Sequence, residues 1–384
     1  MWHKLFPYVY ERYLARQIYW SFLFILFALI ALFVFFDFIG EMGDTNESYS
    51  SLVAFITVLL RVPSRMVEIM PIAVLIAGIY TFASMASQSE FTVLRVGGLH
   101  TEKAAWSLLK MALPLAVLIL VMSELVGPFT ENLSKNVRLS ALNSGREALQ
   151  LKSGAWIKDK LRNSQGEVID GSRYINVGAI ETNGSIRGLR MYEFDKNHRL
   201  LSSRTAELVE FKGEGVWDLR KVTETQFKEL PASHPLDPSF STRITKVDQL
   251  TIRTEVNPQL LGALLIKPDR LSILDLFSYI NHLQENKQDY QRYAISFWKK
   301  IIYPFTVIVM LMLALPFAYL QTRSGGIGYR VFGGIMLGIS FQLFNSLFSH
   351  LGLLGEWPAW LSSIIPASIY LILALIGIRW VSKV

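Results

Sequence analysis

The sequence predicts an α-helical membrane protein with six transmembrane helices, three before and three after an inserted all-β domain of jelly-roll-like type. Apolar residues gather into runs of about 20, the length that crosses roughly 30 Å of hydrocarbon. Charged residues make up only 18% of the chain, against about a quarter in a typical soluble protein. The middle of the chain instead alternates apolar and polar residues, as β-strands do. An ordinary soluble enzyme is therefore excluded.

Six apolar runs have the length and composition of membrane spans. They cover approximately Ile18–Ile39, Met66–Ala86, Ala104–Val126, Ile301–Leu320, Val331–Leu351 and Pro358–Val381. A further run, Leu52–Leu60, is too short to cross, and we interpret it as an interfacial helix or an outward extension. The first run is too long for the core of a signal peptide, and no small-residue cleavage site follows it.

The distribution of basic residues predicts the orientation. The short loops Gly40–Ser51 and Gly352–Trp357 contain no lysine or arginine. The termini and the loops on the other side hold nine basic residues, namely Lys4, Arg12, Arg16, Arg95, Lys103, Arg323, Arg330, Arg379 and Lys383. Because lysine and arginine concentrate in cytoplasmic loops, we expect both termini in the cytoplasm and the β domain outside.

The segment between the third and fourth spans changes from helical to strand-like periodicity. Arg187–Phe194 and Val216–Val222 alternate at period two, and about eight such segments precede Val256. This number suits an antiparallel sandwich or jelly roll. Amphipathic helices near Glu131–Gln150 and Ser272–Glu285 are expected to join this domain to the spans. The predicted divisions are residues 1–130, 131–267 and 268–384.

The residues that would support catalysis or cofactor binding are missing from the sequence. Cysteine is absent, no histidines stand at metal-ligand spacing, and no phosphate-binding loop occurs. The ionisable residues Asp37, Glu68 and Glu124 lie near the outer ends of spans, where we interpret them as anchors rather than a midplane ion relay. The net charge of +7 is attributed to cytoplasmic loops and anionic lipid rather than to nucleic acid. The chain is therefore expected to be non-catalytic, with no bound metal or cofactor.

The fifth span carries a stripe of small and amide residues. Gly334 and Gly338 form a G-x-x-x-G pattern, and Gln342 and Asn345 continue the same face. Such a stripe allows another helix to approach closely. Both intramolecular packing and a subunit interface are consistent with it.

The loop between the second and third spans predicts a short cytoplasmic helix near residues 88–98. Ser89 is a plausible N-cap, and Gly97 and Gly98 end the amphipathic turns. An exposed acid, Glu90, beside apolar side chains is typical of a docking helix.

The order of these features resembles that of the LptF/LptG family of lipopolysaccharide export permeases, and the local sequence is closer to the LptG type. The helix beginning Ser89-Glu90 resembles the coupling helix of that family. Further similar stretches are Lys267–Ile273, Arg292-Tyr293 and Trp298–Ile301 with Pro304. The resemblance extends over essentially the whole chain.

The resemblance implies a bacterial inner-membrane complex with several partners. A second, LptF-like permease would pair with this chain around a V-shaped cavity, and a homodimeric LptB-like ATPase, which holds ATP and Mg²⁺, would dock on the coupling helices. Periplasmic bridge proteins resembling LptC and LptA would receive the lipopolysaccharide. The ATPase-coupling residues implied are Ser89, Glu90, Phe91, Leu94 and Arg95. The implied gate and partner-permease interface consists of Val34, Phe35, Phe38, Gly334, Gly338, Gln342 and Asn345.

The resemblance also implies basic residues that face the phosphates of the lipid. Lys135 and Arg138 match such positions, although a solvated helix face explains them equally simply. Relatives can carry lysines at the outer end of the first span, where this chain has Val34, Gly40 and Glu41. Replacement contacts are expected from Arg61 and Arg65 or from the partner subunit.

Our leading hypothesis is a permease subunit that extracts lipopolysaccharide from the outer leaflet of the inner membrane and passes it toward the outer membrane. The alternative is a mechanotransmission or scaffold subunit that relays ATPase motion without handling lipid. The β domain could serve as a lipid route or only as a support. An integral-membrane enzyme is disfavoured because no acid–base or metal constellation is found.

Overall fold

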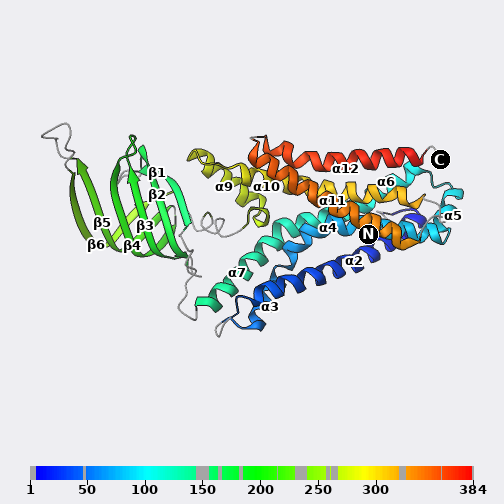
Figure 1. The fold of residues 1–384 in the computed structure, drawn as a ribbon, viewed down its shortest axis with the longest axis horizontal. Helices are drawn as coiled ribbons and strands as arrows, with labels where there is room; N and C mark the ends of the chain where they lie inside the picture. Colours follow the sequence, from blue (N-terminus) through cyan, green and yellow to red (C-terminus); the bar gives the residue numbers. More distant parts are fainter. Residues whose placement is uncertain are drawn as a thin grey trace.

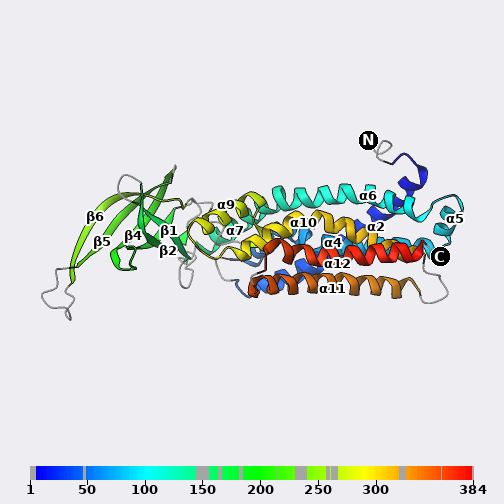
Figure 2. The ribbon, with the colours of Figure 1, turned by 90° about the horizontal axis from the view of Figure 1, so that it is seen from above.

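The computed structural model describes residues 6–45, 49–143, 155–162, 167–180, 185–213, 215–229, 240–256, 260, 267–319, 326–355 and 357–382. The molecule is elongated, with a β-sheet at one end and a bundle of long helices at the other (Figure 1). We call the end of the bundle that faces the sheet the sheet-proximal end, and the opposite end the sheet-distal end. The C-terminus lies at the sheet-distal end (Figures 1 and 2).

The six predicted spans are confirmed as helices that are long and apolar enough to cross a membrane. Each is longer than its apolar core, because polar turns continue the helix beyond the hydrocarbon. The helices are α2 (Val9–Met42), α4 (Val62–Ser87), α6 (Thr101–Val121), α10 (Gln291–Ala314), α11 (Ile327–Leu354) and α12 (Ala359–Val381). The 3-10 turn η3 (Leu315–Ala318) extends α10.

The third span continues directly into the linker helix. A π-helical turn, η1 (Met122–Val126), joins α6 to α7 (Gly127–Asn143) without a break. The division predicted at residue 130 therefore lies inside a helix. Residues 144–150 of the predicted linker helix lie outside the described residues.

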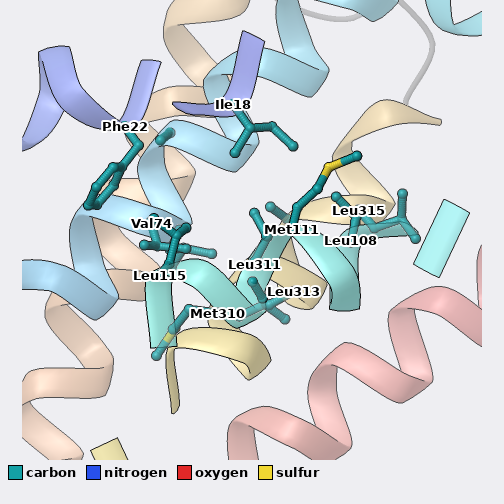
Figure 3. Packing of buried hydrophobic residues seen from close by; sticks show 14 of the residues in the cluster. Ile18, Phe22, Val74, Leu108, Met111, Leu115, Met310, Leu311, Leu313 and Leu315 are labelled. Carbon is teal, nitrogen blue, oxygen red and sulfur yellow. The ribbon is translucent and has the colours of Figure 1, made fainter. Parts of the chain in front are cut away.

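Helix α4 is the centre of the bundle. In its most apolar window 78% of the residues are buried, against 11% for α2 and 22% for α11. Helices α2, α10 and α11 all pack on it. Figure 3 shows part of this core, in which Ile18 and Phe22 of α2, Val74 of α4 and Met310 of α10 meet. The core is therefore made by one buried helix and the surrounding helices that cover it.

The short helices agree with the predictions from sequence. Helix α3 (Ser51–Leu60) is the short apolar helix before α4, and Pro63 stands in the first turn of α4, where its missing N–H costs nothing. Helix α9 (Ile273–Glu285) begins at Ser272, whose Oγ accepts a hydrogen bond of 3.1 Å from the Asp275 N–H.

The inserted β domain is confirmed, with a simpler topology than predicted. Its six described strands form one antiparallel sheet in which each strand pairs with the next along the chain. They are β1 (Ala155–Arg162), β2 (Val168–Ile180), β3 (Ile186–Phe194), β4 (Leu200–Gly213), β5 (Val216–Glu229) and β6 (Phe240–Arg253). The sequence predicted about eight segments in a sandwich or jelly roll, and the described residues contain six strands. Strands β4, β5 and β6 each have 14 residues, so fewer and longer strands account for the same alternation.

The sheet is strongly curved and buries one face (Figure 2). Its apolar cluster includes Ile175, Met191, Trp217 and Leu219. At the end of the sheet that faces the bundle, the two edges of the sheet are linked by side chains. The Thr254 hydroxyl, just after β6, donates to Asp159 Oδ2 of β1 at 2.6 Å, and Arg162 of β1 pairs with Glu255. The sheet is thus closed by polar contacts at this end.

The glycine pattern of the fifth span serves packing inside this chain. A Cβ atom added to Gly334 would lie 2.7 Å from Ile79 Cδ1, and one added to Gly338 would lie 2.8 Å from Ile72 Cγ2, both on α4. The two glycines therefore let α11 approach α4, and they are buried. Of the two alternatives, intramolecular packing is what the structure shows for these two residues, and a role of this span in a subunit interface stays a prediction.

We predict that Gly334→Ala destabilises the protein by about 1–3 kcal/mol, because the added methyl overlaps Ile79. Gly333→Ala is the matched control, since nothing lies within 4 Å of its Cβ position and alanine favours helices by up to about 1 kcal/mol. Thermal unfolding of the purified chain in detergent measures both. Equal stability of the two variants would contradict the close packing of α11 on α4.

Candidate functional site

The sheet-distal end carries the short helix α5 (Glu90–Val96) that was predicted to couple the chain to a partner. Ser89 does not cap it as predicted: its side chain makes no cap bond, and its backbone is left-handed with φ of 61°. The tight turn that follows α4 imposes this conformation, with the Ser89 N–H donating to the Ala86 carbonyl at 3.2 Å. The helix ends at Gly97, and Gly98 has φ of 95°, which glycine adopts without strain.

Helix α5 is anchored to the bundle by aromatic contacts. Phe91 is buried with its ring centroid 6.0 Å from that of Phe82 and 5.0 Å from that of Tyr319. The Arg95 guanidinium lies 4.8 Å from the Tyr319 ring centroid, within the range of a cation–π contact. The outer face of α5 remains apolar and open, because Val93 and Val96 are 69% and 86% exposed.

Glu90 is linked to the first span. Its Oε2 accepts a hydrogen bond of 2.9 Å from the hydroxyl of Tyr13 near the start of α2. Beside this contact is a hollow of about 1110 Å³, lined by the beginnings of α2 and α6 and by α5. Leu94 of α5 and Trp106 of α6 are among its lining residues. The five predicted coupling residues are thus on one short helix next to a wide groove.

The predicted cations at the sheet-proximal end are paired with carboxylates of the same chain. The buried Glu41 carboxylate contacts Arg61 Nη1 at 2.9 Å and Arg138 Nε at 2.8 Å, and it accepts a hydrogen bond from the Tyr49 hydroxyl at 2.9 Å. Arg138 also pairs with Asp44 at 2.6 Å. We call these residues the Glu41 cluster. It joins α2, the start of α4 and α7.

Arg65 and Lys135 lie near this cluster in different surroundings. Arg65 donates to both oxygens of Asp37, at 2.8 and 2.7 Å, and to Glu68 at 2.6 Å. Lys135 Nζ is buried and has no hydrogen-bond partner among the residues that the structure describes. The sequence suggested the cations but not their partners. The available signal for these partners was a group of acidic residues in or beside a loop without lysine or arginine, namely Asp37, Glu41 and Asp44.

The predicted gate residues lie on α2 and α11, which both pack on α4. Phe35 is 57% exposed, whereas Phe38 packs edge-on against Phe55 of α3 with centroids 5.5 Å apart. Val34 is half-buried. On α11, Gln342 is exposed and Asn345 is buried. The open faces of these two spans carry large apolar side chains, including Phe24, Phe27, Met336 and Leu343.

A buried lysine that sequence reasoning missed lies at the same end of the bundle. Lys300 of α10 donates to the Ser123 carbonyl at 2.9 Å and to Glu124 at 3.1 Å, so it bonds α10 to the π-helical turn. Glu124 Oε2 accepts from the Ile273 N–H at 2.7 Å, which also ties in the start of α9. The motif Trp298-Lys299-Lys300 was noted in the sequence only as a resemblance. A lysine directly before the apolar run Ile301–Leu320 was the available signal.

These features define a class of protein: a six-span membrane protein with an inserted antiparallel β domain, a short amphipathic helix at one end and no group of metal-ligating side chains in the described part of the chain. The sequence comparisons define the family. The model of the lipopolysaccharide export system permease family LptF/LptG matches residues 12–380, and the chain belongs to this family.

Two relatives illustrate the similarity. The chain is 29% identical over 332 residues to the lipopolysaccharide export system permease protein LptG of Escherichia coli strain K12, covering 85% of this chain and 86% of that protein. It is 28% identical over 317 residues to the LptG protein of Haemophilus influenzae, covering 82% of each chain. The protein is accordingly a multi-pass inner-membrane protein of the permease type.

We predict that Glu41→Gln destabilises the chain by about 2 kcal/mol or more, because two arginines lose the buried carboxylate that neutralises them. Asp44→Asn is the matched control. Its carboxylate is 61% exposed, so the loss is expected to stay below about 1 kcal/mol. Unfolding monitored by circular dichroism in detergent compares the two. A similar loss for both variants would show that burial of Glu41 does not matter.

Proposed function

We propose that this chain is a permease subunit of an ABC transporter that extracts lipopolysaccharide from the outer leaflet of the inner membrane. The observation that carries the proposal is the family match from residue 12 to residue 380, because it includes all six spans, the β domain and the docking helix. ATP would be hydrolysed by a separate cytoplasmic subunit. The extracted lipid would pass to periplasmic bridge proteins that lead to the outer membrane.

The geometry of α5 supports docking of the ATPase. A surface that binds a partner needs exposed apolar residues with a charge that sets the register. Val93 and Val96 supply the apolar part, and Glu90 supplies the charge. Phe91 packs against Phe82 of α4 and Tyr319 at the end of η3. A displacement of α5 would therefore be transmitted to the buried core. The Tyr13 contact offers a second path, directly to α2.

The orientation follows from the basic loops, with both termini and α5 in the cytoplasm and the β domain in the periplasm. In this orientation, the open faces of α2 and α11 would meet a second, LptF-like permease. Lateral gates formed there would contain Phe35, Gln342 and the exposed apolar residues of both helices. Asn345, Gly334 and Gly338 would lie on the buried side of α11, away from the gate.

A lipid phosphate at the Glu41 cluster would compete with the carboxylates of the cluster for its arginines. Arg61 and Arg138 share Glu41, and Arg65 is held by Asp37 and Glu68, so a bound phosphate must displace or join these partners. Arginine suits this exchange because its planar guanidinium can bind carboxylate and phosphate at once. The buried Lys135 would become available only if α7 moved.

A buried charge network in the β domain favours a supporting role for this domain. Arg173 donates to Glu193 at 2.9 Å and to the Arg253 carbonyl at 2.9 Å, and Glu193 also binds Arg204. These groups occupy the end of the sheet that faces the bundle. Acyl chains passing there would have to disrupt buried ion pairs, which costs several kcal/mol. This network therefore favours the β domain as a support over the β domain as a lipid route.

We predict that Glu90→Lys reduces ATP-driven lipid export at least about tenfold, because it reverses the charge at the docking surface. Folding and membrane insertion should be intact, since Glu90 is not part of the buried core. Export is measured in proteoliposomes that contain both permeases and the ATPase. Tyr13→Phe separates the two paths, because it removes the hydroxyl that donates to Glu90 and leaves the charge of Glu90 in place. Normal export by Glu90→Lys would exclude the docking role.

We also predict that photoreactive probes at residues 34–39 of α2 form ATP-dependent adducts with lipopolysaccharide, whereas probes at Val216–Val222 of β5 do not. Mass spectrometry of the reconstituted complex identifies the adducts. Adducts in the sheet would assign the β domain to the lipid route. No adducts at either place, with ATP hydrolysis intact, would favour the scaffold alternative for the whole chain.

A third prediction concerns the phosphate contacts. The double change Lys135→Ala with Arg138→Ala should reduce crosslinking of α2 to lipid more than it reduces assembly with the partner subunits. The ratio of adduct to assembled complex, compared with that of the unchanged protein, measures this. Equal losses would indicate that the two residues act only in structure.

A further inference from the structure

A second, smaller pocket lies at the sheet-proximal end of the bundle. Its volume is about 270 Å³, and it is bounded by α4, α6, α10, α11 and the 3-10 turn η2 (Pro268–Arg270). It adjoins the face of α11 that would form a gate, because Gln342 belongs to that face and also lines the pocket. Most of its lining residues are polar or charged, which is unusual between the ends of apolar helices.

Several charged side chains that line the pocket already form ion pairs within this chain. Lys300 forms an ion pair with Glu124, and Arg270 Nη1 contacts Glu131 Oε1 at 2.9 Å. Arg65 is paired with Glu68 and with Asp37, outside the pocket. These pairs hold the helices together and leave little charge for a ligand.

Three other charged side chains that line the pocket form no ion pair among the described residues. Lys267 and Lys299 form no ion pair among the described residues, and both line the pocket. Asp269 also forms no ion pair there, and its Oδ1 accepts a single hydrogen bond, from the Ser296 hydroxyl at 2.7 Å. The pocket thus presents two available cations and one available carboxylate.

This arrangement complements a ligand that carries a phosphate and a primary ammonium close together. A lysine ammonium binds phosphate as a compact point charge, and a carboxylate accepts the N–H donors of an ammonium. A pocket of about 270 Å³ falls just below the usual range of roughly 300–1,000 Å³ for drug-sized ligands, so it suits a headgroup rather than a whole lipid. Its place at the ends of the spans is the depth at which headgroups lie.

We propose that this pocket binds the phosphoethanolamine headgroup of a lipid, with the phosphate on Lys267 and Lys299 and the ammonium on Asp269. Two membrane lipids offer this group: phosphatidylethanolamine, and lipopolysaccharide whose lipid A carries phosphoethanolamine. The proposal requires only that the spans cross a membrane, and it is independent of the export function.

The test uses the full-length chain in detergent and native mass spectrometry with three phospholipids of identical acyl chains. Phosphatidylethanolamine should bind about threefold to tenfold more tightly than phosphatidylglycerol, which lacks the ammonium, or phosphatidylcholine, which lacks the N–H donors. Asp269→Asn should remove this preference. Lys299→Gln should weaken binding of all phosphate headgroups, and Lys299→Arg should retain it.

Lys246→Gln serves as the control variant, because Lys246 is an exposed cation on β6, far from the pocket. Thermal unfolding without added lipid verifies that each variant is folded. Equal binding of the three headgroups would overturn the proposal, and so would a preference for phosphatidylethanolamine that survives Asp269→Asn.

A second comparison identifies the source of the headgroup. Lipid A with and without phosphoethanolamine is added to the same preparation. Tighter binding of the decorated form, lost in Asp269→Asn, supports the proposal with lipopolysaccharide as the natural ligand. Indifference to the decoration, together with selective binding of phosphatidylethanolamine, supports it with the phospholipid as ligand. Indifference in both comparisons would refute it.

Discussion

Close approach of helices to α4 is the constraint on which the rest of the structure depends. Inside a bilayer, helices gain little from the hydrophobic effect and associate through tight packing at small residues. Gly78 of α4 faces Ala314 of α10, where an added Cβ would lie 2.6 Å from the alanine Cβ, and Gly334 and Gly338 of α11 face isoleucines of α4. Once these contacts hold α4 in the centre, the outer faces of α2 and α11 remain open.

Charge is arranged around this core in two different ways. At the sheet-proximal end, the carboxylates of the Glu41 cluster and of Lys300's partner Glu124 bond neighbouring helices to one another. At the sheet-distal end, the buried Glu11 of α2 pairs in the same way with Lys110 of α6 at 2.9 Å. Glu90 differs, because among the described residues it forms no ion pair and accepts only from the neutral Tyr13 hydroxyl. The paired carboxylates give rigidity, whereas the charge of Glu90 is not neutralised within the described part of the chain.

Much of the fold could be predicted from the sequence, because membrane spans and alternating strands are local patterns. The six spans, α3, α9 and the inserted β domain follow directly from apolar length and periodicity. The described residues contain six strands where about eight segments were expected, since alternation does not show where one long strand such as β4 continues. The Ser89 cap was wrong because residue type cannot reveal a left-handed backbone. The partners of Gly334, Arg61 and Arg138 depend on which helices meet, and no local pattern determines that. The roles of the coupling, gate and phosphate residues stay predictions.

The unbroken run from α6 through the π-helical turn into α7 has a mechanical consequence. It begins at Thr101, five residues after α5 ends, and its described part ends at Asn143, near the β domain. At 1.5 Å per residue, this run follows a path of about 65 Å. Pro114 and the π-helical turn are points where a helix bends, so this path is an upper limit to the straight length of the run. A tilt of about 5° at the end near Thr101 would move the end near Asn143 by up to about 6 Å, with the hydrogen bonding of the helix unchanged.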